Sequence, residues 1–176
     1  DSFSGIERLL FADLATGFDI EGAAGQAYRI YKAAFDRAPD QGGLGYWIAQ
    51  LDAGESLLNV ATGFVGSAEF ASLYGENPTN EEYTRALYLN VLDREPDQAG
   101  YAYWNAVLNG DPVLGQTTRE QMLVDFSESG ENQDNVAELW KDFVDAIEQN
   151  RAPACDIEAG HRATTAALLG MLSLKL

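Results

Sequence analysis

Residues 37–47 read Arg-Ala-Pro-Asp-Gln-Gly-Gly-Leu-Gly-Tyr-Trp, and residues 94–104 read Arg-Glu-Pro-Asp-Gln-Ala-Gly-Tyr-Ala-Tyr-Trp. The match extends over residues 28–51 and 85–108, which align without a gap. Two helices that were similar by chance would share their apolar spacing, but not this order of Arg, Pro, Asp and Gly. The chain therefore contains an internal repeat, and such a repeat says more about architecture than any single motif does.

The repeated motif predicts that one helix stops and a second one begins. Its arginine is expected in the last turn of the first helix, where a cation interacts favourably with the C-terminal end of the helix dipole. Its proline cannot continue that helix, and its aspartate is a good N-cap for the next helix because the carboxylate accepts hydrogen bonds from backbone N–H groups. In the two copies these residues are Arg37 and Arg94, Pro39 and Pro96, and Asp40 and Asp97.

The helix after each motif carries a Tyr-Trp pair, and its apolar residues recur at helical spacing. We expect these residues to be buried: Leu44, Trp47 and Leu51 in copy one, and Tyr101, Trp104 and Leu108 in copy two. We expect the helix to end at Gly54 in copy one and at Gly110 in copy two. A third helix completes each copy, and copy two has an insertion around residues 111–116.

These patterns predict a mainly α fold, a tandem-repeat helical bundle over residues 21–136, with copy one at residues 23–74 and copy two at residues 81–132. Residues 1–20 contain two short stretches that read as strands separated by a turn, and they predict a short N-terminal β-hairpin. Residues 137–176 predict an amphipathic helix followed by an apolar helix.

The chain is strongly acidic: 28 Asp and Glu residues against 11 Lys and Arg residues give its 176 residues a formal net charge of −17. Such a charge argues against nucleic-acid binding and against an anionic membrane surface. The longest apolar stretch, residues 166–174, is too short to cross a bilayer. Positive partners fit better, and Ca²⁺ is the obvious candidate for a carboxylate-rich chain.

The sequence offers few groups for catalysis. Cys155 is the only cysteine and His161 the only histidine, so a disulfide within the chain, a thiolate metal cluster and a zinc site are all disfavoured. No calcium loop with alternating aspartates occurs, and no glycine-rich phosphate loop follows a strand. We therefore expect no enzyme, no catalytic residues and no cofactor or metal site in these residues.

The repeated motif allows two interpretations. Aromatic faces bind sugars and cations well, so the Tyr-Trp pairs would make a ligand platform. Alternatively, the tryptophans anchor their helices to the core and the Arg and Asp hold the turn together, which the helical spacing favours. The candidate ligand or structural residues are Arg37, Asp40, Tyr46, Trp47, Arg94, Asp97, Tyr103 and Trp104.

The pattern of residues 28–40, of residues 43–47 and of Phe64-Val65-Gly66-Ser67-Ala68-Glu69-Phe70 resembles the bacterial domain of unknown function 4214 family. The second copy, which ends at residues 126–132, resembles it too, so the likeness covers about residues 21–136. This resemblance implies a helical module of large secreted, surface-layer or adhesin-like proteins, often exported by type I secretion, with no catalytic residues. Residues 5–13 resemble the end of a calcium-binding beta-roll that often precedes such a domain.

The tail has a different likeness. Within about residues 138–176, residues 139–147 and 153–165 are similar to the C-terminal end of Gfo/Idh/MocA-type NAD(P)-dependent oxidoreductases. The nucleotide-binding domain and the catalytic lysine region of such enzymes are absent from this sequence, so the likeness does not imply activity.

Three hypotheses follow for the function. The first is a non-enzymatic scaffold or adhesion module of a secreted or cell-surface bacterial protein, next to calcium-binding repeats in a longer chain, with glycans or cell-surface polymers as partners. The second is a carbohydrate-binding module that uses exposed Tyr-Trp pairs. The third is an inactive C-terminal oxidoreductase fragment fused to the repeat domain.

Overall fold

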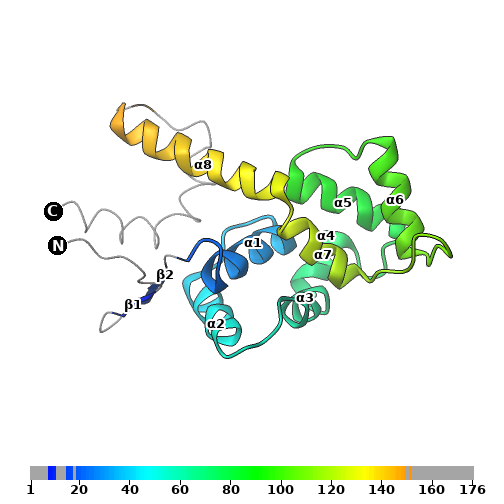
Figure 1. Cartoon of the computed structure of the whole chain (residues 1–176), viewed down its shortest axis with the longest axis horizontal. Coiled ribbons are helices and arrows are strands. Elements are labelled where there is room, and N and C mark those ends of the chain that lie inside the picture. Colours follow the sequence, from blue (N-terminus) through cyan, green and yellow to red (C-terminus); the bar gives the residue numbers. More distant parts are fainter. Residues whose placement is uncertain (1–7, 11–14, 18, 150, 152–176) are drawn as a thin grey trace.

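The computed structural model describes residues 8–10, 15–17, 19–149 and 151, and its secondary structure is mainly helical (Figure 1). The elements are β1 (Arg8–Leu10), β2 (Ala15–Gly17), α1 (Ala23–Phe35), α2 (Gln41–Asp52), α3 (Leu57–Val65), α4 (Ala68–Tyr74), α5 (Asn80–Leu92), α6 (Gln98–Leu108), α7 (Arg119–Ser127) and α8 (Gly130–Glu148). Strand β1 pairs with β2 in antiparallel register, with Arg8 opposite Gly17.

Side-chain caps begin the helices from α2 to α7. In each case an Asp, Ser or Thr in extended backbone accepts a hydrogen bond from an N–H group of the first turn, which otherwise has no partner in the helix. The expected caps of α2 and α6 are confirmed. The six N-cap residues are Asp40, Ser56, Ser67, Thr79, Asp97 and Thr118.

The first helix of each copy ends in an unusual way. Asp36 and Asp93 are the C-caps of α1 and α5, and they have the left-handed backbone conformation, with φ of 45° and 53°. The arginine of each motif therefore lies one residue beyond the cap. The expectation that Arg37 and Arg94 belong to the last helical turn was wrong by this margin, because the left-handed residue turns the chain before the arginine is reached.

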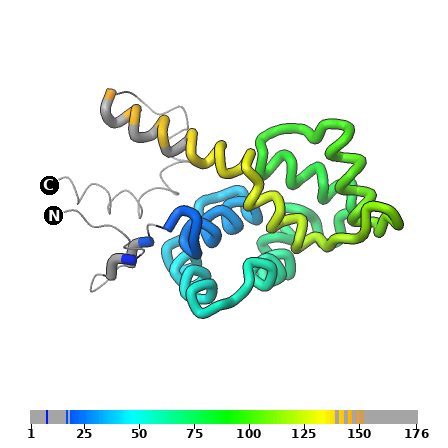
Figure 2. Tube along the Cα trace, in the orientation of Figure 1, coloured from blue at the N-terminus to red at the C-terminus, as the bar shows by residue number. Residues whose placement is uncertain are grey.

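The two motif-bearing segments share one hydrophobic core. Helix α7 follows the second motif in sequence, yet it packs against α1 and α3, which flank the first motif. Figure 2 shows the chain returning in this way after the loop that follows α6. Leu123 of α7 and Ile30 of α1 are fully buried in the cluster that results.

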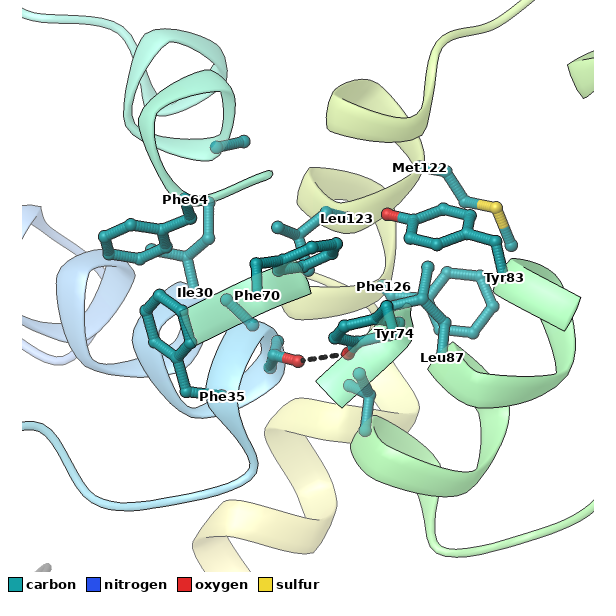
Figure 3. Packing of buried hydrophobic residues seen from close by; sticks show 14 of the residues in the cluster. Ile30, Phe35, Phe64, Phe70, Tyr74, Tyr83, Leu87, Met122, Leu123 and Phe126 are labelled. Carbon is teal, nitrogen blue, oxygen red and sulfur yellow. Dashed lines mark hydrogen bonds between the residues drawn. The ribbon is translucent and has the colours of Figure 1, made fainter. Parts of the chain in front are cut away.

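Helix α4 connects the two sides of this core (Figure 3). Phe70 and Tyr74 are stacked with their ring centroids 4.0 Å apart, and Tyr74 lies 5.7 Å from the ring of Tyr83 on α5. The Tyr74 hydroxyl donates a hydrogen bond to the carbonyl oxygen of Ala33 at 3.2 Å. Burial raises the pKa of Tyr74 to about 12, so the hydroxyl stays a donor at neutral pH.

A partly buried ion pair also joins the two segments. Arg29 of α1 donates to both carboxylate oxygens of Glu128, the C-cap of α7, at 2.9 and 2.6 Å. Arg29 also donates to the carbonyl oxygen of Ile20 at 2.6 Å, and its side chain is only 5% exposed. Since Arg29 and Glu128 are 99 residues apart, this contact fixes the first helix of the bundle to the seventh.

Helix α8 extends away from the rest of the bundle after packing against α5 and α7 (Figure 1). It is continuous over residues 130–148, so the domain boundary expected at residue 136 falls inside it. Residues 152–176, which carry Cys155, His161 and much of the oxidoreductase resemblance, lie outside the described residues. In the part of the chain that the structure describes, none of the helices combines the length and the apolar character needed to span a bilayer.

Candidate functional site

The first motif forms a clamp within its own segment. Arg37 donates to both carboxylate oxygens of Glu69, at 2.6 and 3.1 Å, and to the Tyr31 hydroxyl at 3.0 Å. Its guanidinium also lies 5.0 Å from the centroid of the Tyr31 ring. The Tyr31 hydroxyl donates to Asp40 at 2.9 Å, so one hydrogen-bonded chain runs from Glu69 to the N-cap of α2.

The second motif forms a similar clamp. Arg94 donates to both carboxylate oxygens of Glu131, at 2.5 and 2.9 Å, and its guanidinium lies 4.9 Å from the centroid of the Tyr88 ring. A more distant ion pair of 3.7 Å joins Arg94 to Asp97. Both arginines therefore connect the turn that contains them to the start of a later helix.

The charges of the clamps favour this geometry. The hydrogen bonds from Arg94 lower the pKa of Glu131, and the backbone N–H of Gly100 lowers the pKa of Asp97. In the first clamp, the backbone N–H of Gly43 and then the Tyr31 hydroxyl lower the pKa of Asp40. These three carboxylates are therefore ionised at neutral pH, as binding to arginine and capping of a helix require.

The Tyr-Trp pairs lie at the edge of the core. Tyr46 and Tyr103 are 56% and 47% exposed. Trp47 is half-buried with its ring 5.1 Å from Phe64. The expected burial of the second helix of each copy is thus only partly correct, because α2 has no buried residue, and in α6 only the last two residues, Val107 and Leu108, are buried. These short helices cover one side of the core and leave their other faces in solvent.

A cleft of about 170 Å³ lies beside the second clamp. Trp104 is half-buried at its wall, with its ring 5.4 Å from Phe126. The cleft combines aromatic surface with charged groups and a hydroxyl. It is lined by Tyr88 and Leu92 of α5, Trp104 of α6, Asp125 and Phe126 of α7, and Arg94, Ser129 and Glu131 of the connecting turns and the start of α8.

The structure brings only some of the expected residues to this cleft. Arg94 and Trp104 line it, whereas Asp97 and Tyr103 do not. The sequence reasoning missed Asp125 as a lining residue. A signal existed, since residue 125 aligns with Gly63 of copy one, and the change from glycine to aspartate was visible in the repeat.

Among the residues that the structure describes, no group of three or more His, Cys, Asp or Glu side chains is placed to hold a metal ion. The groups that line the cleft are an aromatic ring suited to stacking, the carboxylate of Asp125, and the ion pair of Arg94 with Glu131.

Comparison with known proteins finds one family. The family model described as "Domain of unknown function (DUF4214)" matches residues 26–73 and residues 61–136. The two matched segments overlap and together span both motifs. No curated protein and no solved structure matches the chain.

Proposed function

The chain belongs to the DUF4214 family, whose function is unknown, and we propose that it is a non-enzymatic helical scaffold or adhesion module built from a tandem repeat. In this proposal it is part of a longer, secreted or cell-surface bacterial protein and is followed or preceded by calcium-binding repeats. Its partners are the other domains of that protein and cell-surface polymers.

The use of the motif residues inside the fold carries this proposal. Arg37 and Arg94 each bind a glutamate of the same copy, and Asp40 and Asp97 each cap a helix. Groups engaged in this way hold the chain path and are not free to act on a substrate. The shared core of the two copies supports the same role, because residues of both copies are buried in one hydrophobic cluster.

The net charge of −17 supports an extracellular setting with positive partners, of which Ca²⁺ is one. Calcium belongs to the neighbouring repeats in this proposal. Thermal melting of the chain with Ca²⁺ and with a chelator tests this point, since binding to the folded state raises the melting temperature. We expect equal melting temperatures, and a shift of several degrees would place a calcium site inside the chain.

Substitution of both clamp arginines tests the scaffold role. We expect the double variant Arg37→Ala/Arg94→Ala to have a melting temperature a few degrees lower than that of the unchanged chain. Below that temperature, we expect beads coated with the folded variant to adhere to bacterial cell-wall polymers as well as beads coated with the unchanged chain. The matched control is Arg85→Ala, which removes an arginine from the exposed pair with Glu95. Loss of adhesion with the fold intact would show that the arginines form a binding site and would contradict the proposal.

A second candidate function, carbohydrate binding, is favoured by the cleft at Trp104. Aromatic rings beside polar groups are a common way to bind sugars, and this cleft offers both. Glycan-array binding that is lost in Trp104→Ala and kept in Trp47→Ala would support it. Equal effects of the two substitutions would argue against a site at this cleft, because Trp47 is the corresponding residue of copy one.

A further inference from the structure

The cleft lies at a place where the two copies differ in two side chains. Phe35 and Gly63 of copy one correspond to Leu92 and Asp125 of copy two, and both of the latter line the cleft. In copy one the ring of Phe35 fills the space beside Phe64, with centroids 4.8 Å apart. A leucine lacks that ring, so copy two has more room at this point.

Gly63 of copy one affects how the Trp47 ring packs. A Cβ atom on Gly63 would lie 3.4 Å from Cη2 of Trp47, so the indole packs against the bare backbone of α3. Copy two has an aspartate at the corresponding position of α7, so a polar side chain lies there in place of the bare backbone. The ring geometry also differs, since Trp104 is tilted by 56° from Phe126, whereas Trp47 is perpendicular to Phe64.

The charges in the cleft do not balance. Arg94 and Glu131 form a two-point ion pair and neutralise each other. Asp125 is exposed, and its Oδ1 accepts a hydrogen bond from the neutral amide of Gln121 at 2.9 Å. One negative charge therefore remains beside an aromatic wall, an arrangement that attracts a cation and disfavours phosphate or carboxylate ligands.

From these features we propose that the cleft of copy two binds a protonated amino sugar. The sugar ring stacks on Trp104, and its ammonium group binds the carboxylate of Asp125. The volume of about 170 Å³ suits one sugar unit, since it is below the roughly 300 Å³ at which pockets for drug-sized ligands begin. The indole of Trp104 at the wall offers an aromatic surface on which the C–H face of a sugar ring can stack. This inference rests on the carbohydrate-binding candidate above and adds the class of sugar and the copy that binds it.

Calorimetry of the whole chain at physiological ionic strength tests the inference with two probes, the trisaccharides of glucosamine and of N-acetylglucosamine. We expect the glucosamine trimer to bind about tenfold more tightly, because acetylation removes the positive charge. We expect Asp125→Asn to remove this preference, and the double variant Leu92→Phe/Asp125→Gly, which carries the residues of copy one, to abolish binding.

Glu76→Gln is the matched control, since it removes the same charge from an exposed residue outside the cleft and leaves binding unchanged. Equal binding of both trimers, lost in Trp104→Ala, would overturn the amine preference and leave carbohydrate binding standing. Binding of trilysine but of neither sugar would overturn both, in favour of a protein partner. Binding that persists in Leu92→Phe/Asp125→Gly, with the fold verified by circular dichroism, would overturn the location.

Discussion

The two motif-bearing segments keep the same clamp but differ in the side chains packed beside it. In both, an arginine lies over a tyrosine and binds a glutamate through two hydrogen bonds. Next to the clamp, copy one has a close cluster that includes Phe35 and Trp47, whereas copy two has Leu92 and a cleft. The residues that set the chain path are thus retained, and the neighbouring packing is where the copies have diverged.

The copies also differ in how they contribute to the shared core. Helix α7 of copy two packs against both α1 and α3 of copy one, and the ion pair of Arg29 with Glu128 joins the copies at one end. The positions that correspond to these two residues are Ala86 and Gly66, so this pair occurs once and not as a repeated feature. The bundle is therefore a single body with two unequal halves.

The largest expected effect comes from breaking the shared core. Leu123 is fully buried on α7, and we expect Leu123→Ala to lower the free energy of unfolding by about 2–5 kcal/mol, because it leaves a cavity among α1, α3 and α7. Urea unfolding followed by tryptophan fluorescence measures the change. Leu114→Ala is the control, since Leu114 is 53% exposed and should change stability by less than about 0.5 kcal/mol. Two separate transitions would contradict a shared core.

The ion pair between the copies comes next. We expect Arg29→Ala to destabilise the fold by about 1.5–3 kcal/mol, because it leaves Glu128 and the carbonyl of Ile20 without their charged donor. Chemical denaturation of the variant measures this loss. Lys32→Ala serves as the comparison on the same helix, since Lys32 makes only a 3.9 Å pair with Asp36. A loss no larger than that of Lys32→Ala would show that Arg29 does not tie the copies together.

A smaller, stabilising effect is expected at the left-handed C-caps. Asp93→Gly should raise the free energy of unfolding by about 0.5–1 kcal/mol, because glycine adopts positive φ without strain and removes a negative charge from the C-terminal end of α5. Asp36→Gly should give less, since Lys32 lies beside Asp36. Thermal melting of both variants provides the measurement.

The substitution Asp93→Gly should also change the pKa of Asp36. Burial raises the pKa of Asp36, Lys32 lowers it, and the charge of Asp93 raises it further. A carboxyl group whose pKa is raised by folding favours the folded state at low pH, and this contribution is lost as the pH rises through the folded-state pKa. Because Asp93→Gly removes the charge that raises the pKa of Asp36, this pKa should be lower in an NMR titration of the variant. An unchanged pKa would mean that the two carboxylates do not interact.

The smallest effect is expected for the clamps themselves. Double-mutant cycles of Arg37 with Glu69 and of Arg94 with Glu131 should each give a coupling of about 0.2–1 kcal/mol, because these side chains are about 40% exposed and solvent weakens the attraction. We expect the two couplings to agree. A much larger coupling in copy two would mean that the cleft changes the clamp beside it.

The sequence alone determined where the second helix of each copy starts and that a break in the chain precedes it. Asp40 and Asp97 could be recognised as caps, and Pro39 and Pro96 as breaks, because these effects depend on backbone groups a few residues away. The apolar spacing likewise predicted the helices, although it overestimated how deeply Trp47 and Trp104 are buried. Spacing tells which face of a helix turns inward, but not how much of it a neighbour covers.

Only the tertiary structure decided what the repeat became. The placement of α7 against α1 and α3, the pair of Arg29 with Glu128, and the cleft at Asp125 all depend on contacts between residues that are distant in sequence. Local patterns do not encode such contacts, because they form only when the whole bundle packs. The duplicated motif therefore specified two clamps of the same kind, and packing made one of them the border of a cleft.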